Sequence, residues 1–153
     1  MNKKNTKTYY YTIEISVFKT AVLVIVANNR KDILWDLPTI YADFKITKEA
    51  LAEDIKMIES VWNSDEDPDF MPIGETIRLG NSSGDVLMFF NADNISKISE
   101  ELIVHETHHA STYICDFRGI KDEECEAYVQ EYLFNQMMCK IIEYNNKHKK
   151  KKS

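Results

Sequence analysis

The sequence IVHETHH at residues 103–109 decides the expected fold of this chain. It lies in a predicted helix that begins between residues 94 and 99 and ends near Phe117. His105 and His109 are four positions apart, so a helix projects both imidazoles from one face, one turn apart. Two imidazoles presented in this way can share a tetrahedral Zn²⁺ ion, which makes both residues candidate metal ligands.

Glu106 follows directly after the first of these histidines. On a helix it is rotated by about 100° from His105, close enough to hold a metal-bound water without ligating the metal. Zinc brings the pKa of such a water toward about 7, and a carboxylate can take the proton and pass it to a leaving amine. The pattern therefore predicts Glu106 as the general base of a zinc-dependent hydrolysis.

A catalytic zinc needs a third protein ligand and an open fourth position. The next predicted helix carries the acidic sequence DEECEAY at residues 122–128. We favour Glu124 as the third ligand, with Tyr128 one turn later on the same face. Glu123 and Glu126 remain competitors, because counting along the sequence does not settle the register of this helix.

The rest of the chain predicts an α+β fold. Residues 9–17 and 21–27 have the alternation of strands, with a break near Lys19. Residues 75–79 and 86–90 form a predicted hairpin. A helix capped by Thr47 carries one apolar stripe, made of Leu51, Ile55, Ile58 and Trp62. Residues 30–46 suit neither period. We expect a small antiparallel or mixed sheet with a backing helix, the helix of the histidines and a glutamate-bearing C-terminal helix.

The length of 153 residues suits one domain. We expect a disordered basic N-terminus at residues 1–7, a single domain at residues 8–146 and a disordered lysine-rich tail at residues 147–153. No apolar run approaches the roughly 20 residues that span a bilayer, so no membrane association is expected. Three cysteines are odd in number and few, which argues against a disulfide framework and favours a reduced, cytoplasmic setting.

The formal net charge of −6 conceals an uneven distribution. All 25 acids lie between Glu14 and Glu143, whereas eight lysines lie outside that span at the two ends of the chain. Without these lysines, 11 basic residues stand against 25 acids, and the body of the chain carries a charge of −14. A nucleic-acid groove needs a basic face, so the charge argues against a nucleic-acid partner.

The segment VHETHHASTYICDFRGIKDEECEAYVQEYL, at residues 104–133, resembles the zincin metallopeptidases of the gluzincin branch. The short chain is similar to the minimal minigluzincin domains. The same segment resembles small zinc peptidases encoded by phages and prophages, which show VHExxHA, a short loop and then D-E-x-x-A-Y. The resemblance covers residues 84–135 well and the N-terminal strand loosely.

This resemblance implies a zincin-like fold with His105, His109 and Glu124 as zinc ligands and Glu106 as the general base. When Ala127 and Tyr128 are aligned with the A-Y of the D-E-x-x-A-Y pattern, Glu124 is favoured over Glu123 as the ligand. The strand at residues 86–90 would be the edge strand that pairs with an extended substrate.

The sequence also departs from the gluzincin pattern that it resembles. Many gluzincins place an aspartate one turn after the ligand glutamate, where this chain has Tyr128. Tyr128 is therefore a candidate catalytic donor to an oxyanion, and Asp116 is a candidate carboxylate to orient a ligand histidine. A metzincin would need glycine and histidine where this chain has Thr112 and Cys115. His108 lies one residue off the ligand face and is expected at the surface or the rim of a cleft.

The expected function is that of a zinc metallopeptidase acting on a peptide or protein substrate as a monomer. The alternative is a catalytically silent zincin-like phage protein that serves as a structural or interaction module. The two differ in whether a chelator-sensitive cleavage activity exists.

Overall fold

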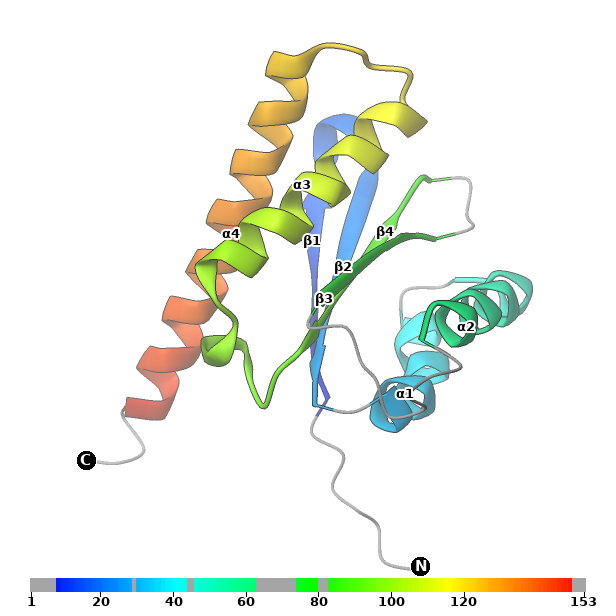
Figure 1. Ribbon diagram of the computed structural model, residues 1–153, viewed down its shortest axis with the longest axis vertical. Coiled ribbons are helices and arrows are strands. Elements are labelled where there is room, and N and C mark those ends of the chain that lie inside the picture. Colours follow the sequence, from blue (N-terminus) through cyan, green and yellow to red (C-terminus); the bar gives the residue numbers. More distant parts are fainter. Residues whose placement is uncertain (1–7, 29, 44–45, 63–73, 80–82, 150–153) are drawn as a thin grey trace, which may run out of the picture.

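The computed structural model describes residues 8–28, 30–43, 46–62, 74–79 and 83–149. Its centre is a mixed four-stranded sheet in the order β1-β2-β4-β3 (Figure 1). The strands are β1 (Tyr9–Ile15), β2 (Thr20–Ala27), β3 (Gly74–Arg78) and β4 (Val86–Asn91). The β1–β2 and β3–β4 pairs are antiparallel, and β2 is parallel to β4. The α+β class and the predicted hairpin, which β3 and β4 form, are confirmed.

Two helices cover each face of the sheet. The helices are α1 (Arg30–Asp43), α2 (Lys48–Trp62), α3 (Glu100–Phe117) and α4 (Glu123–Lys149). Val22, Val24 and Val26 face the layer of α3 and α4, whereas Leu23 and Ile25 face the layer of α1 and α2. Because helices cover both faces, β2 is apolar along almost its whole length instead of alternating.

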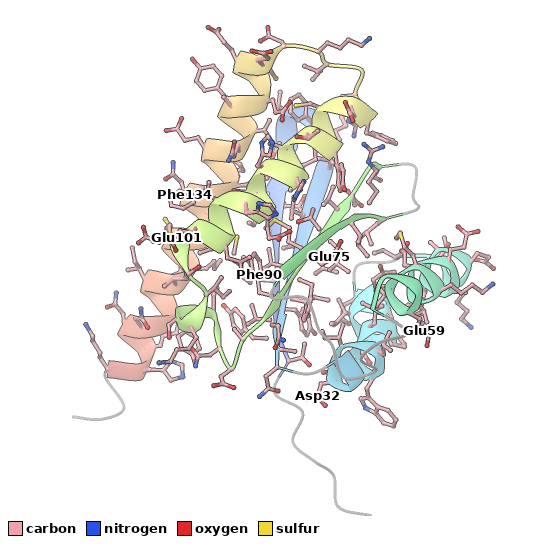
Figure 2. All side chains as sticks on the ribbon, viewed as in Figure 1. Asp32, Glu59, Glu75, Phe90, Glu101 and Phe134 are labelled. Atoms are coloured by element: carbon pink, nitrogen blue, oxygen red, sulfur yellow. The ribbon has the colours of Figure 1, made fainter. Side chains whose placement is uncertain are left out.

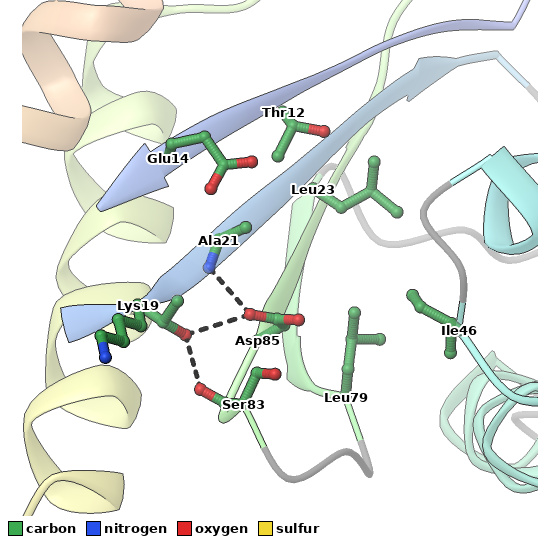
Figure 3. Close-up of a pocket in the computed structure, with 10 residues that line it drawn as sticks. Thr12, Glu14, Lys19, Ala21, Leu23, Ile46, Leu79, Ser83 and Asp85 are labelled. Carbon is green, nitrogen blue, oxygen red and sulfur yellow. Dashed lines mark hydrogen bonds between the residues drawn. The ribbon is translucent and has the colours of Figure 1, made fainter. Parts of the chain in front are cut away.

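The connection between β1 and β2 breaks the extended chain where the sequence predicts a break. A short 3₁₀ turn occupies Ser16–Phe18, and Lys19 adopts a left-handed conformation with φ of 50°. Asp85, just before β4, then fixes the start of β2 by accepting hydrogen bonds from the Ala21 amide at 2.8 Å and the Thr20 hydroxyl at 3.2 Å (Figure 3). The three residues that make these bonds line a cavity of about 250 Å³ on the α1 and α2 side of the sheet.

Helix α1 occupies most of the stretch that the sequence pattern leaves unassigned. Ile33, Leu37, Ile40 and Tyr41 are buried at helical spacing, so tertiary packing overrides the interior Pro38. The Tyr41 hydroxyl donates a 2.9 Å hydrogen bond to Asp54, which joins α1 to α2. The predicted cap of α2 is confirmed, because Thr47 Oγ1 accepts a hydrogen bond from the Ala50 amide at 3.2 Å.

The sheet order corrects one expectation. The strand at residues 86–90 belongs to β4, which lies between β2 and β3 and is not an edge. All five of its core residues, including Phe90, are buried in the sheet interior (Figure 2). The edge beside α3 is β3, so any extended peptide that joins the sheet there would pair with β3.

Helix α3 begins where a capping pattern places it. Ser99 Oγ accepts a hydrogen bond from the Leu102 amide, and two glutamates stand in the first turn. The turn after α3 ends on Gly119, whose φ of 68° suits glycine.

Helix α4 continues through Lys149, beyond the boundary at residue 146 expected from the sequence. Residues 1–7, 150–153 and the expected acidic loop at residues 64–69 lie outside the described residues. Of the helices described, none is long and apolar enough to cross a membrane.

Candidate metal centre

His105 and His109 project from the same face of α3, one turn apart, as expected. Their Nε2 atoms lie 3.2 Å apart and their ring centroids 4.6 Å apart. Two nitrogen atoms that each bind zinc at about 2.0–2.1 Å in tetrahedral geometry are separated by about 3.3 Å. The two imidazoles therefore converge with the spacing that a shared zinc ion requires.

Glu106 points to the other side of the same turn, toward β3. Its side chain is buried, and its Oε2 accepts a 2.6 Å hydrogen bond from the hydroxyl of Thr76. The same hydroxyl also lies 3.2 Å from the Glu106 carbonyl oxygen. Thr76 thus holds both the side chain and the backbone of this residue, which fixes the direction in which the carboxylate points.

Gly74 allows this close approach of β3 to α3. A Cβ atom at position 74 would lie 3.0 Å from Glu106 Oε1 and 3.0 Å from Leu102 Cδ1, closer than most real contacts. A side chain here would push against the carboxylate, so the glycine provides the space that the carboxylate occupies.

Helix α3 turns its two histidines outward because its opposite face is apolar. Ile103, Ala110 and Ile114 are buried against the sheet and α4. Thr107 is also buried, and its hydroxyl is satisfied by the Ile103 carbonyl oxygen at 2.8 Å. With this stripe fixed against the core, the histidines must face outward between β3 and α4.

On the β3 side, an aromatic and ionic cluster flanks His109. The imidazole stacks on Tyr113, with ring centroids 6.3 Å apart. The Arg78 guanidinium lies 4.6 Å from the centre of the Tyr113 ring and makes a 2.9 Å ion pair with Asp116. Asp116 therefore pairs with Arg78, and the structure does not place it as the carboxylate that orients a ligand histidine.

Glu75, also on β3, is affected by the same environment. Partial burial and the nearby charge of Glu106 raise the pKa of the Glu75 carboxyl above its usual value. The negative charges of Glu75 and Glu106 therefore repel each other.

On the α4 side, the glutamate that reaches α3 is Glu126. Its Oε1 accepts a 2.5 Å hydrogen bond from Thr112 and lies 3.7 Å from Nδ1 of His108. One turn further along α4, Gln130 donates to the Val104 carbonyl oxygen at 3.2 Å. The register of α4 thus turns residues 126 and 130 toward the helix of the histidines.

The same register turns Glu124 and Tyr128 away. Glu124 is exposed, and Tyr128, four residues later, is 70% exposed and lines a cavity with the turn that follows β1. Glu123 is also exposed. The structure therefore does not bring the favoured ligand Glu124, or the candidate donor Tyr128, to the two histidines, because a shift of two residues on a helix changes direction by about 200°.

Among the described residues, no three His, Cys, Asp or Glu side chains are gathered closely enough to hold a metal ion. The pair of histidines fits zinc by its nitrogen spacing. On α4, the carboxylate of Glu126 contacts Thr112 and His108, which lie on the adjoining face of α3.

Two residues of the candidate site have no counterpart in the sequence reasoning. Thr76 and Gly74 act on Glu106 from a strand about thirty positions earlier, and such a contact leaves no local pattern. The one sequence signal for these two residues is the alternation of β3, which places both on the same face of the strand, the face toward α3.

Comparison with known proteins adds no assignment: no family model, no curated protein and no solved structure matches this chain.

Proposed function

We propose that this chain is a zinc-dependent peptidase whose metal is held by His105 and His109. The single observation that supports this most strongly is the 3.2 Å separation of their Nε2 atoms, with Glu106 fixed on the adjoining face of the helix. This pairing of two convergent imidazoles with a positioned carboxylate is what metal-assisted hydrolysis of an amide requires.

The third ligand in this proposal comes from the first turn of α4. Glu126 is the best candidate by position, because it is the acidic residue of the 122–128 stretch whose carboxylate contacts α3. In this proposal Glu126 exchanges its hydrogen bond with Thr112 for a bond to the metal. Glu124 remains the ligand implied by the resemblance to gluzincins, and the two candidates are separable by mutation.

When bound, zinc would polarise the scissile carbonyl and lower the pKa of a water molecule. Glu106 then accepts a proton from the attacking water and donates it to the leaving amine. Thr76 keeps the carboxylate in one orientation during both transfers, since its hydroxyl donates to Oε2. Burial of Glu106 excludes bulk water from the carboxylate.

Strand β3 offers a place for an extended peptide substrate. It is an edge of the sheet, and Thr76 at its middle contacts the proposed base. A peptide that pairs with this edge would run past Glu106, which suits hydrolysis of a bond in an extended chain.

The test is peptide cleavage by Glu106→Gln and by a matched variant, Glu101→Gln. Glu101 is an exposed carboxylate on the same helix (Figure 2). We expect chelator-sensitive cleavage of a casein or peptide-library substrate by the wild type and by Glu101→Gln. Glu106→Gln should lose about 10²–10⁴-fold in rate while its zinc content is unchanged.

Two results would contradict the proposal. If Glu106→Gln cleaves as fast as the wild type, Glu106 is not the base. If the wild type binds zinc but cleaves nothing, the chain is a zincin-like structural or interaction module instead.

A further inference from the structure

Helix α4 forms one side of the molecule, and its outer face carries an exposed stripe (Figure 1). The buried residues of this helix, Val129, Leu133 and Met137, lie on its inner face in the core shared with the sheet and α3. The opposite face repeats at spacings of four and three residues, and every member of that repeat is exposed. The members of this outer stripe are Tyr128, Tyr132, Asn135, Cys139, Ile142 and Asn146. A surface helix usually turns charged and polar residues outward, so the apolar members of the stripe suit a face that a partner covers.

The two halves of the outer stripe differ in shape. Near the start of α4, Tyr128 and Tyr132 border a cavity of about 550 Å³ together with Val17, which follows β1. The Tyr132 hydroxyl donates a 2.9 Å hydrogen bond to the Glu14 carbonyl oxygen, which holds that ring beside the cavity. Toward the end of α4, the Ile142 side chain is 56% exposed. The stripe thus has an apolar hollow at one end and an exposed apolar side chain at the other.

The charges of α4 are divided between its two ends. Its first turn carries Glu123 and Glu124, and its last turn carries Lys147 and Lys149. Two parallel copies of the helix would place like charges side by side at both ends. Two antiparallel copies place the acidic first turn of each beside the basic last turn of the other, and they also oppose the two helix dipoles.

We propose that α4 is an antiparallel dimerisation helix, on which Ile142 of one copy fills the hollow beside Tyr128 and Tyr132 of a second copy. Tyr132 and Ile142 lie five residues before and five residues after Met137. An antiparallel pair centred there therefore sets each Tyr132 opposite the Ile142 of the other copy, and one two-fold contact fills both hollows. This inference does not depend on the proposed zinc site, and it departs from the monomer expected from the sequence.

A second copy is the occupant that the described residues favour, because one chain supplies both halves of the contact. The hollow and the side chain that fills it lie on the same helix, and so do the acidic and basic turns. The helix has 27 residues and is about 40 Å long. One face of one helix is smaller than the roughly 800 Å² per partner of a standard interface, so we expect a dissociation constant in the micromolar range.

The experiment measures the mass of the full chain by sedimentation equilibrium at protein concentrations from about 1 to about 100 μM. A chelator is present throughout, so a shared metal ion cannot join two copies. We expect a monomer–dimer equilibrium that weakens as the salt concentration rises, because salt screens the attraction between the charged turns. A wild-type chain that is still monomeric at about 100 μM would overturn the proposal and leave the stripe to a different protein.

A matched pair of variants tests the hollow. Ile142→Glu should weaken dimerisation at least about 10-fold, because it places a charge in the apolar hollow of the second copy. Trp35→Glu changes a side chain on α1 that is 76% exposed, and it should dimerise like the wild type. Circular dichroism checks that both variants are folded. Wild-type dimerisation by Ile142→Glu, or loss of the dimer in Trp35→Glu, would contradict the proposal.

A double variant tests the antiparallel direction. Lys147→Glu with Lys149→Glu makes both ends of α4 acidic, so antiparallel copies repel each other and the dimer should weaken. Its remaining association should strengthen as salt rises, which is the opposite of the wild type and which a loss of helix structure would not produce. In a parallel pair the change only replaces one repulsion by another. A double variant that dimerises as tightly as the wild type, with the same salt dependence, would therefore exclude the antiparallel pair.

Discussion

The Glu106 carboxylate is buried and held by a neutral hydroxyl donor, Thr76, instead of a paired cation. Thr76→Val removes that donor and keeps the shape of the side chain. Since a hydrogen bond to a charged group contributes about 1.5–3 kcal/mol, we expect kcat/KM to fall about 10- to 100-fold. Peptide cleavage and zinc content, measured on the same preparation, would separate a loss of positioning from a loss of metal.

The conservative variant Thr76→Ser restores the hydroxyl and should recover most of the lost rate. If Thr76→Val lowers zinc content as much as activity, Thr76 supports the fold and not the orientation of Glu106.

Glu75 gives a pH dependence of known sign. Its pKa is raised in the folded protein by burial and by the charge of Glu106, so the folded state binds a proton more tightly than the unfolded state. The stability contributed by this residue is therefore present below its unfolded pKa of about 4.3 and is lost as pH rises through its folded pKa. Glu75→Gln should be more stable than the wild type at pH 7 and equal to it near pH 3.

Urea unfolding at a series of pH values measures this difference directly. Glu59→Gln, a matched change at an exposed glutamate on α2, should show no such growth with pH (Figure 2). A stability difference for Glu75→Gln that is the same at pH 3 and pH 7 would mean that the raised pKa has no energetic consequence.

The direction of the side chains on α4 decides which glutamate could complete the proposed metal site. Glu126 contacts α3, whereas Glu124 is exposed on the face that also carries Tyr128. We expect Glu126→Gln to weaken zinc binding by more than the roughly 10- to 100-fold that loss of a supporting residue causes. Glu124→Gln should leave the dissociation constant within about twofold of the wild type.

Competition with a zinc-binding dye on both variants measures these constants. The reverse ranking, with Glu124→Gln impaired and Glu126→Gln unaffected, would identify Glu124 as the ligand. It would also show that α4 binds the metal in a different register.

The predictability of each element depended on how local its determinants are. The spacing of His105 and His109, the cap at Thr47 and the β3–β4 hairpin are set within a few residues, and all three lie where the sequence predicts them. Helix α1 was not predictable, because its stability comes from packing against the sheet and α2 in spite of Pro38.

The order of the strands and the register between helices depend on distant contacts. The edge position of β3 depends on the parallel pairing of β2 with β4, which joins segments about sixty residues apart. The choice among Glu123, Glu124 and Glu126 depends on how α4 lies against α3. The helical pattern of the sequence is compatible with any of the three as the ligand. These features needed the three-dimensional arrangement.

Over the whole molecule, the sheet acts as a support between two layers of different character. The layer of α1 and α2 packs on one face and contributes apolar residues such as Ile33 and Ile58. The layer of α3 and α4 carries the outward-facing histidines, the buried Glu106 and the partly exposed Glu126. The candidate catalytic and metal-binding residues all lie on that side, between the edge strand β3 and the first turns of α4.

The central claim is that His105 and His109 bind zinc together, and metal content tests it most directly. Wild-type protein purified without chelator and supplied with zinc should hold about one zinc per chain, and His109→Ala should hold almost none. His148→Ala, which changes a histidine near the end of α4, should retain the wild-type content. Zinc content well below one per chain in the wild type, or unchanged content in His109→Ala, would contradict the account.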